Sequence, residues 1–355
     1  MKKFLSASTK PIIICGPCSA ESREQVLKSA EEVKESGIEW FRAGLWKPRT
    51  RPHSFEGVGE EGISWLNEVQ KMYSLKVCTE VANPYHVELC LKNNIDALWI
   101  GARSAANPFT VQEIAESLRG VKDISVMVKN PTTPDVNLWL GDIERIEKQG
   151  INDIIAVHRG FNLQNNLPYR QSPLWRIPLE LKQRRKDLKI ICDASHIAGK
   201  SELVKEIAKC SASIGFNGLM IEAHSNPKKA KTDAQQQLYT KELKSFLNEI
   251  NFPLQNKGQE DCNLQMYREE INDIDENICI LMAERMNLSK KIAQIKIEKN
   301  MTVFQADRWK EVMNRTLERG EQAGLSKDFL QEIYNIIHQE SVRLQENIIN
   351  SKNGK

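Results

Sequence analysis

Eight short apolar segments recur along the first 250 residues, and their alternation with longer amphipathic segments limits the fold more than any other feature. Continuous apolar runs separated by helical segments are typical of parallel strands buried on both faces. Eight such units in this length predict an α/β fold, a closed (β/α)8 TIM barrel, rather than an open doubly wound sheet. No Gly-x-Gly-x-x-Gly follows the first run, which argues against dinucleotide binding. The predicted strands are Ile12–Cys15, Trp40–Ala43, Val77–Val81, Ala97–Ile100, Ser125–Val128, Ile154–Val157, Ile190–Cys192 and Gly218–Ile221.

The alternation of apolar runs with amphipathic segments ends at about residue 250. The next 13 residues, 251–263, lack any period and include Pro253 and Gly258, which is typical of a linker. Apolar residues then recur at spacings of three and four from Leu264 to Ile295, as in a long helix packed on other helices. Two shorter helices are predicted at Gln305–Arg319 and Ser326–Asn350. The predicted organisation is a barrel (1–250), a linker (251–263) and a small all-α domain of three helices (264–355).

Composition excludes several classes of protein. The 355-residue chain has a net charge of +3, too small to predict binding to nucleic acid or an anionic membrane. Its apolar runs are too short to span a bilayer, and the N-terminus lacks the apolar stretch of a signal peptide. Eight cysteines without a disulfide framework indicate reduced thiols, so we expect a cytoplasmic protein.

Charged residues follow the predicted strands, and the active site of such a barrel lies at the carboxyl ends of its strands. One set there mixes sulfur, nitrogen and oxygen donors, which suits a divalent transition metal: Cys18, His196, Glu222 and Asp233. A second set is cationic, and its arginine forks match phosphate and carboxylate groups: Arg42, Lys47, Arg49, Arg103, Lys129 and Arg159. Other polar residues at these ends are Glu80, His158, Asp193 and His224. Each residue alone is more often structural, but the joint pattern predicts a substrate with several negative charges.

The motifs at these strand ends resemble 3-deoxy-D-arabino-heptulosonate 7-phosphate (DAHP) synthase, of the shorter class related to 3-deoxy-D-manno-octulosonate 8-phosphate synthase. They are CGPCSAE, RAGLWKPRTRPHSFEGVGEEG, TEV, IGAR, VKNPTT, HRGF, CDASHIAG and GLMIEAHSNPKKAKTD. The resemblance covers about residues 10–245, and its KPRT stretch favours the heptulosonate enzyme. The octulosonate synthase remains the alternative, separable by supplying arabinose 5-phosphate. Because the first predicted strand starts at Ile12, we expect no regulatory domain before the barrel.

The resemblance implies condensation of phosphoenolpyruvate with erythrose 4-phosphate, the entry to aromatic amino-acid synthesis by the shikimate pathway. By motif, the first set would bind Mn2+, with Fe2+, Co2+ or Zn2+ as alternatives. Phosphoenolpyruvate would be held by Arg103, Lys129 and Arg159, with Arg42 and Lys47 near its carboxylate, and the erythrose 4-phosphate phosphate by Arg49 and Thr50. Lys47 is the candidate for proton transfer to the new alkoxide, and a metal-bound water is the competing assignment.

The segment Cys-Gly-Pro-Cys at residues 15–18 has the four letters of the thioredoxin redox centre. In a chain with eight barrel units, we expect Cys18 to be a metal ligand and Cys15 to be a small core residue inside the strand. Oxidation of this pair after loss of the metal is a minor hypothesis.

The all-α domain has an arginine, Arg285, in the apolar register of its first helix (278, 281, 285, 288). A buried guanidinium is costly without an anion, which leaves two interpretations: an ion pair with a facing glutamate, or a ligand-binding role. The segments REEINDIDENICILMAERMNLSKKIAQIK, QADRW and HQESVRLQ resemble chorismate mutase of the all-helical class over residues 264–350. This implies conversion of chorismate to prephenate in an intertwined dimer, as a homodimer or homotetramer. The implied chorismate-binding set is Arg268 from the partner chain, Arg285, Lys296, Gln305, Arg308, Ser341 and Gln345.

Two positions depart from the mutase pattern, since Gln305 replaces an acid and Trp309 replaces a glutamate that contacts substrate. A non-enzyme alternative is that this domain serves only for dimerisation or effector sensing. DNA binding is not expected, because residues 259–355 hold 14 Lys/Arg against 17 Asp/Glu. If the domain binds prephenate, we expect it to couple pathway flux to the barrel as a feedback sensor.

Overall fold

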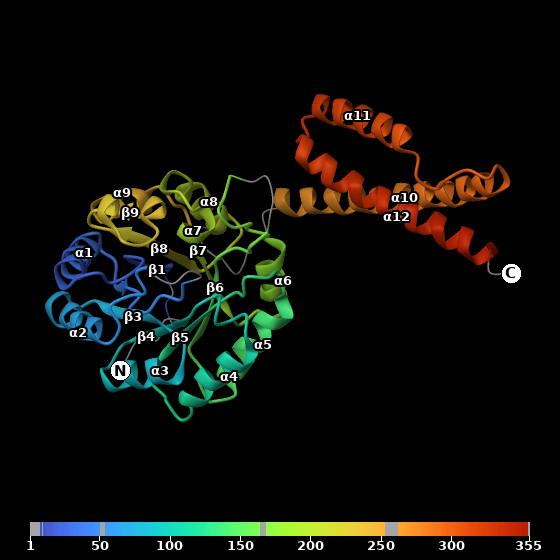
Figure 1. The fold of residues 1–355 in the computed structure, drawn as a ribbon. Coiled ribbons are helices and arrows are strands. Elements are labelled where there is room, and N and C mark those ends of the chain that lie inside the picture. Colours follow the sequence, from blue (N-terminus) through green and yellow to red (C-terminus); the bar gives the residue numbers. More distant parts are fainter. Residues whose placement is uncertain (1–7, 9, 50–53, 164–167, 253–261, 354–355) are drawn as a thin grey trace. The chain divides into compact units, whose positions relative to one another are not determined.

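The computed structural model confirms the (β/α)8 barrel and the helical region after it (Figure 1). It describes residues 8, 10–49, 54–163, 168–252 and 262–353. Within these residues, eight parallel strands follow one another in sequence order, and β1 pairs with β8 to close the sheet. They are β1 (Ile12–Gly16), β2 (Trp40–Arg42), β3 (Lys76–Val81), β4 (Ala97–Ile100), β5 (Ser125–Lys129), β6 (Ile154–His158), β7 (Lys189–Asp193) and β8 (Gly218–His224). All eight predicted strands are present, with ends that differ by a few residues.

Helices surround the strands, and polar side chains cap several of them. Asn83 and Asn107 each accept a hydrogen bond from a backbone N–H of the helix that follows, and a proline occupies the first turn in both. Asp135 accepts two such bonds. The helices are α1 (Arg23–Glu35), α2 (Glu61–Tyr73), α3 (Pro84–Lys92), α4 (Pro108–Ser117), α5 (Val136–Glu147), α6 (Arg176–Arg184), α7 (Ala194–Ala198), α8 (Ser201–Ser213) and α9 (Leu243–Asn248). Between β8 and α9 lie the 3-10 turns η1 (Pro227–Lys229), η2 (Ala234–Gln236) and η3 (Thr240–Glu242), and the short strand β9 (Leu238–Tyr239), which pairs with β8.

The barrel interior is filled by side chains. Because side chains alternate along a strand, Trp40, Trp99, Met127 and Met220 fall in one buried cluster inside the barrel. A larger core fills the space between the strands and the outer helices, and Cys15 lies in this outer core, fully buried. The packed interior leaves the carboxyl ends of the strands as the place for polar chemistry.

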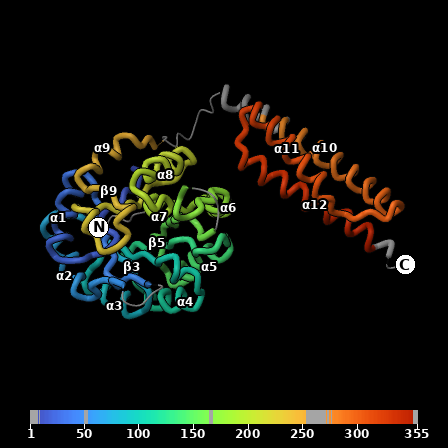
Figure 2. The backbone as a smooth tube through the Cα atoms, turned by 45° about the horizontal axis from the view of Figure 1, so that its top comes forward, coloured from blue at the N-terminus to red at the C-terminus, as the bar shows by residue number. Residues whose placement is uncertain are grey.

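The C-terminal region consists of three helices within the described residues, α10 (Cys262–Glu298), α11 (Ala306–Gln322) and α12 (Lys327–Asn353), which lie side by side (Figure 2). The chain forms two compact units, Met1–Gln255 and Asn256–Lys355. Most of the predicted linker lies outside the described residues. Gly320 lets Leu330 approach closely, since a Cβ there would overlap that side chain, and Gly324 adopts a φ of +82° in the turn. No helix in the described part of the chain is long and apolar enough to cross a membrane.

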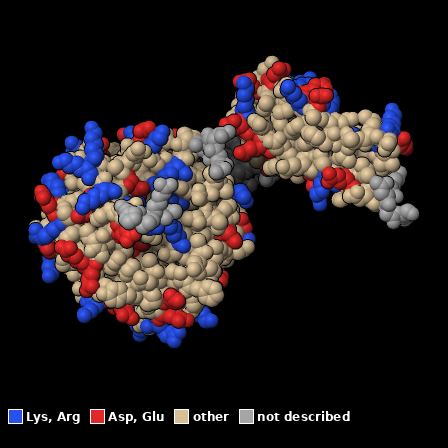
Figure 3. Space-filling view, in the orientation of Figure 1, with Lys and Arg blue, Asp and Glu red and all other residues tan. Residues whose placement is uncertain are grey.

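The apolar register of α10 is open to solvent within a single chain. Ile278, Leu281 and Leu288 are 42%, 63% and 58% exposed, and Arg285 is half-buried. Within one chain, α12 packs on a neighbouring face of α10, where Ala293 is buried, and leaves this register uncovered. In the view of Figure 3, a broad area of the described helical unit is free of charged side chains.

Candidate active sites

The carboxyl ends of the strands carry charged side chains on the face that points into the barrel. Glu80, Lys129, Asp193 and Glu222 each stand two residues after an apolar residue of the interior cluster. Arg42 has the same relation to Trp40. Because side chains on a strand have a period of two, the apolar interior continues into a charged layer at the mouth.

A sulfur–oxygen cluster lies at this mouth. One ligand atom each of Cys18, Glu222 and Asp233 falls within 4.8 Å of the others, and Cys18 Sγ is 3.2 Å from Asp233 Oδ2. The fourth predicted ligand, His196, has its Nε2 atom 3.7 Å from Glu222 Oε1. The donor types fit a divalent transition metal.

Lys47 places a cation against this cluster. Its Nζ atom contacts Cys18 Sγ and lies 2.6 Å from Asp233 Oδ2. Burial alone would lower the pKa of Lys47, but Cys18, Glu222 and Asp233 raise it overall. Burial, and then the charge of Glu222, raise the pKa of Cys18, so the thiolate form depends on positive charge at the cluster. The donor set therefore fits a bound cation.

Asp193 joins the cluster to the cationic set. Its Oδ2 atom lies 2.9 Å from His196 Nδ1, an ion-pair distance without the alignment of a hydrogen bond. The same oxygen accepts a 2.6 Å hydrogen bond from Lys129 Nζ. A carboxylate beside the second ring nitrogen orients a metal-ligating histidine, so Asp193 is placed to orient both side chains.

The cationic set surrounds the same space. Arg42 is 2% exposed, donates to Glu222 Oε1 at 3.1 Å and lies over the Trp99 ring. Its Nε and Nη1 atoms are buried without a hydrogen-bond partner among the described residues. Burial lowers the pKa of Arg159 to about 10; the charge of Asp193 opposes this shift, whereas the neighbouring Arg170 and Arg103 add to it. Arg103 donates to the carbonyl of Pro48.

All described members of the two predicted barrel sets line one cavity of about 370 Å³. These members are Cys18, Arg42, Lys47, Arg49, Arg103, Lys129, Arg159, His196, Glu222 and Asp233. Thr50 lies outside the described residues. His158 does not belong to this set: it points outward, packs against Phe161 and Trp175, and its pKa is lowered to about 3 by burial.

Sequence reasoning missed Arg170 and Gln171, which also line the cavity. Arg170 Nη1 donates to Asp233 Oδ1 and Gln236 Oε1, both at 2.9 Å. Gln171 Oε1 accepts a 3.0 Å hydrogen bond from Arg159. Both lie in the long connection between β6 and α6, where no motif singles out a position. For Arg170, the one signal in the sequence is a basic side chain in a strand–helix loop, where the active-site residues of a barrel lie.

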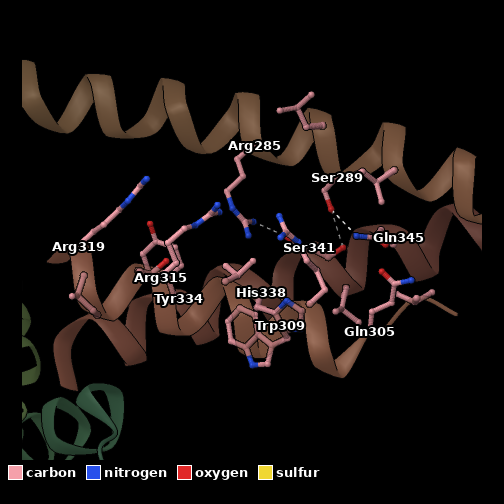
Figure 4. A pocket seen from close by; sticks show the side chains of 18 of the residues that line it. Arg285, Ser289, Gln305, Trp309, Arg315, Arg319, Tyr334, His338, Ser341 and Gln345 are labelled. Atoms are coloured by element: carbon pink, nitrogen blue, oxygen red, sulfur yellow. Dashed lines mark hydrogen bonds between the residues drawn. The ribbon is translucent and has the colours of Figure 1, made fainter. Parts of the chain in front are cut away.

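A second cavity, of about 980 Å³, lies among the three C-terminal helices (Figure 4). Arg285, Ser289 and Lys296 line it from one face of α10, at spacings of four and seven residues. Ser341 and Gln345 line it from α12, one turn apart. The helical period of 3.6 thus builds two facing polar stripes.

Hydrogen bonds join the two stripes. Arg285 Nη1 donates to Ser341 Oγ at 2.6 Å, and Lys296 Nζ donates to Gln345 Oε1 at 3.1 Å. Gln345 Nε2 in turn donates to Ser289 Oγ at 2.9 Å. Burial lowers the pKa of Lys296.

The helix α11 supplies the third wall of this cavity, including Arg308, together with Gln305 at the N-cap of the helix. All described members of the predicted mutase set line the cavity, and the side chain of Arg268 lies outside the described residues. Sequence reasoning missed Ser289 and His338. The His338 ring stacks on Trp309 with centroids 3.9 Å apart, and its pKa is lowered by burial and then by the nearby cations Arg285 and Lys296.

The barrel and the charged layer at its mouth define a class, an α/β-barrel enzyme built for anionic substrates. Comparison with known proteins gives the family. Residues 5–253 match the DAHP synthetase I family, and residues 267–346 match chorismate mutase type II. The chain therefore belongs to the DAHP synthetase I family and carries a chorismate mutase domain, so it is a bifunctional enzyme of the shikimate pathway.

The curated relatives support the heptulosonate assignment more strongly than the octulosonate one. The phospho-2-dehydro-3-deoxyheptonate aldolase of Thermotoga maritima is 31% identical over 67% of this chain and 68% of its own length. The 2-dehydro-3-deoxyphosphooctonate aldolase of Janthinobacterium is 27% identical over 68% of this chain and 89% of its own. The crystal structure of the Thermotoga enzyme superimposes with a TM-score of 0.61, 28% identity and 68% coverage of both chains. The DAHP synthase family is metal-dependent in general.

Proposed function

We propose that the barrel condenses phosphoenolpyruvate with erythrose 4-phosphate to give 3-deoxy-D-arabino-heptulosonate 7-phosphate and phosphate, and that the cavity among α10, α11 and α12 converts chorismate to prephenate. The observation that carries the barrel assignment is the convergence of a Cys/His/Glu/Asp set and the six predicted cations, joined by Arg170, on one cavity. One cavity with these groups suits two anionic substrates that must meet.

The metal would be held by Cys18, His196, Glu222 and Asp233. Mn2+ is our first choice, with Fe2+, Co2+ or Zn2+ as alternatives. When bound, a divalent metal supplies Lewis-acid polarisation of a carbonyl oxygen. The contact of Lys47 with Cys18 and Asp233 supports a site that attracts positive charge.

The cationic set would position phosphoenolpyruvate. Arg103, Lys129 and Arg159 would bind its phosphate, and Arg42 and Lys47 would lie near its carboxylate. The buried, unpaired donor atoms of Arg42 and the lowered pKa of Arg159 support this, since both indicate cations that an anion would stabilise.

Condensation would form a bond between C3 of phosphoenolpyruvate and the aldehyde carbon of erythrose 4-phosphate. Lys47 Nζ would give a proton to the aldehyde oxygen as it becomes an alkoxide. Water would then add its oxygen to the cationic C2 centre and lose one proton, which balances the proton given by Lys47. The bond from C2 to the phosphate oxygen would then break, and the second water proton would leave with inorganic phosphate as C2 becomes a carbonyl. Arg103, Lys129 and Arg159 would stabilise the charge of the leaving phosphate.

The test of the barrel activity is substrate choice. We expect release of phosphate from phosphoenolpyruvate when erythrose 4-phosphate is supplied, and little with arabinose 5-phosphate. Arg49 would contact the erythrose 4-phosphate phosphate together with Thr50. A preference for arabinose 5-phosphate would instead establish the octulosonate synthase.

The mutase reaction needs no covalent group from the protein. Arg285 and Arg308, with Arg268 of a second copy, would bind the two carboxylates of chorismate, and Lys296 and Gln345 would stabilise charge on the ether oxygen. Gln305 and Ser341 would complete the set. The hydrogen bonds between the α10 and α12 stripes support this, because they hold these groups in place before substrate arrives.

We further propose that the enzyme is a homodimer or homotetramer in the cytoplasm. The exposed apolar register of α10, at Ile278, Leu281 and Leu288, suits a second copy of this helix. The helical domain would also act as the feedback sensor, with prephenate binding one state of the assembly better than the other.

A further inference from the structure

Three consecutive glutamines, Gln235 to Gln237, come after Asp233 and Ala234, and they differ in burial. Gln235 is exposed, whereas Gln236 and Gln237 are 1% and 2% exposed. Asp233 has a left-handed backbone with φ of +46°, and it begins the turn η2. The strand β9, which follows directly, pairs Leu238 with a residue of β8. The segment is therefore fixed beside the strand that carries Glu222.

Both polar atoms of the Gln236 amide are used within this site. Its Nε2 atom donates to Glu222 Oε2 at 2.6 Å, and its Oε1 atom accepts from Arg170 Nη1 at 2.9 Å. Arg170 also donates to Asp233 Oδ1 at 2.9 Å. Gln236 thus forms one side of a network that links the two carboxylates of the cluster through an arginine. Only this orientation of the amide gives a donor to the carboxylate and an acceptor to the guanidinium.

Gln237 fixes the third member of the cluster in the same way. Its Oε1 atom accepts from the backbone N–H of Cys18 at 3.1 Å, and its Nε2 atom donates to the carbonyl of Thr232 at 2.9 Å. This amide therefore ties the loop after β1 to the residue just before Asp233. Because the amide is buried, removing it would leave a buried backbone N–H and a buried carbonyl unsatisfied.

We infer that Gln236 and Gln237 are positioning residues of the metal site: one segment would supply the ligand Asp233 and hold the ligands Glu222 and Cys18 in place through adjacent glutamines. This inference rests on the proposed ligand set. Residues that orient metal ligands typically change metal affinity about 10- to 100-fold when removed. Neither glutamine is proposed to contact substrate. Their removal should therefore weaken metal binding, and it should lower turnover only through that loss.

The test compares Gln236→Met, Gln237→Met and Gln235→Met. Methionine keeps the length of the side chain and removes its hydrogen bonds, and exposed Gln235 is a matched control from the same segment. The readout is the Kd of the full-length metal-free protein for Mn2+, measured by titration calorimetry, with the unfolding temperature of each metal-free variant beside it. We expect Kd to rise about 10- to 100-fold in the first two variants and to stay near wild type in Gln235→Met.

Mn2+ affinity equal to wild type in Gln236→Met and Gln237→Met, at an unchanged unfolding temperature, would overturn the inference. An equal loss in all three variants would also overturn it. If a methionine variant does not fold, the corresponding asparagine variant replaces it, because the shorter amide cannot span both contacts and should show the same loss. Cys18→Ala tests the proposed ligand set independently of the glutamines: wild-type Mn2+ affinity in that variant would refute the ligand set itself.

Discussion

Replacing Arg285 by alanine is the sharpest test of the mutase assignment. Within the described residues, its hydrogen-bond partner is Ser341 Oγ at 2.6 Å, and it lines the cavity beside Lys296. A guanidinium has five N–H donors, so donors remain for a carboxylate. The alternative interpretation, an ion pair with a facing glutamate, has no counterpart among the described residues.

The expected loss of mutase activity in Arg285→Ala follows from this geometry. Losing a charge-assisted, partly desolvated contact with a carboxylate costs about 3 to 5 kcal/mol. That corresponds to a loss of roughly 150- to 5,000-fold in kcat/KM for chorismate. Arg285→Lys should recover part of this loss, because it keeps the charge and loses the fork.

The assay is the disappearance of chorismate, with thermal unfolding of the helical domain measured on the same sample. Arg343→Ala is the matched control, since Arg343 lies on α12, is exposed and pairs with Glu340. It should have wild-type kinetics. Loss of stability in Arg285→Ala with full activity in the folded fraction would refute the reasoning and favour a structural role.

Three further predictions concern the barrel and its coupling to the helical domain. Burial raises the pKa of Asp142 to about 7, so barrel stability should fall as pH rises from about 4 to 7; Asp142→Asn should remove this slope. Cys18→Ala should abolish condensation and spare the mutase, whereas Cys15→Ala should be nearly silent. Truncation after residue 255 should leave a barrel that prephenate no longer inhibits.

The direction of this pH dependence follows from which state of the protein, folded or unfolded, binds the Asp142 proton more tightly. Its carboxyl oxygens are buried without hydrogen-bond partners among the described residues, so the folded state keeps the proton while the unfolded state releases it. A pKa raised by about three corresponds to about 4 kcal/mol, all of it lost above pH 7. Exposed Glu144 on the same helix provides the control, Glu144→Gln. An unchanged slope in Asp142→Asn, measured by denaturant unfolding, would contradict the prediction.

The predictions for the cysteine variants and for the truncated protein each have one outcome that would contradict them. Damage from Cys15→Ala comparable to that from Cys18→Ala would show that the ligand assignment is wrong, because Cys15 lies in the outer core. Equal prephenate inhibition of the full-length and truncated proteins would place the effector site in the barrel and refute the coupling.

Much of the fold could be predicted because its signals are local. Buried parallel strands read as apolar runs, and the period of two then carries Glu80, Lys129 and Glu222 to the inner face of the mouth. The same period separates Arg159, which lines the cavity, from His158, which packs outward among aromatic rings. Without this alternation, His158 and Arg159 are indistinguishable as polar residues at the end of β6.

Other parts of the sites could not be predicted because their partners are distant in the sequence. Arg170 and Gln236 meet across 66 positions, and neither carries a local signal. The Trp309–His338 stack joins two helices, although each residue alone reads as an ordinary core or surface position. The apolar register of α10 has the sequence pattern of a buried stripe, although it is exposed within one chain. Periodicity predicts that a helix face is covered, but it does not show which chain covers it.

The most direct test of the central claim is exhaustive removal of metal from the full-length enzyme, with both activities measured on one sample. The account predicts that condensation of phosphoenolpyruvate with erythrose 4-phosphate is lost and returns when Mn2+ is added, while conversion of chorismate continues unchanged. Full condensation activity in protein shown by elemental analysis to be metal-free would contradict the account, and so would parallel loss of both activities.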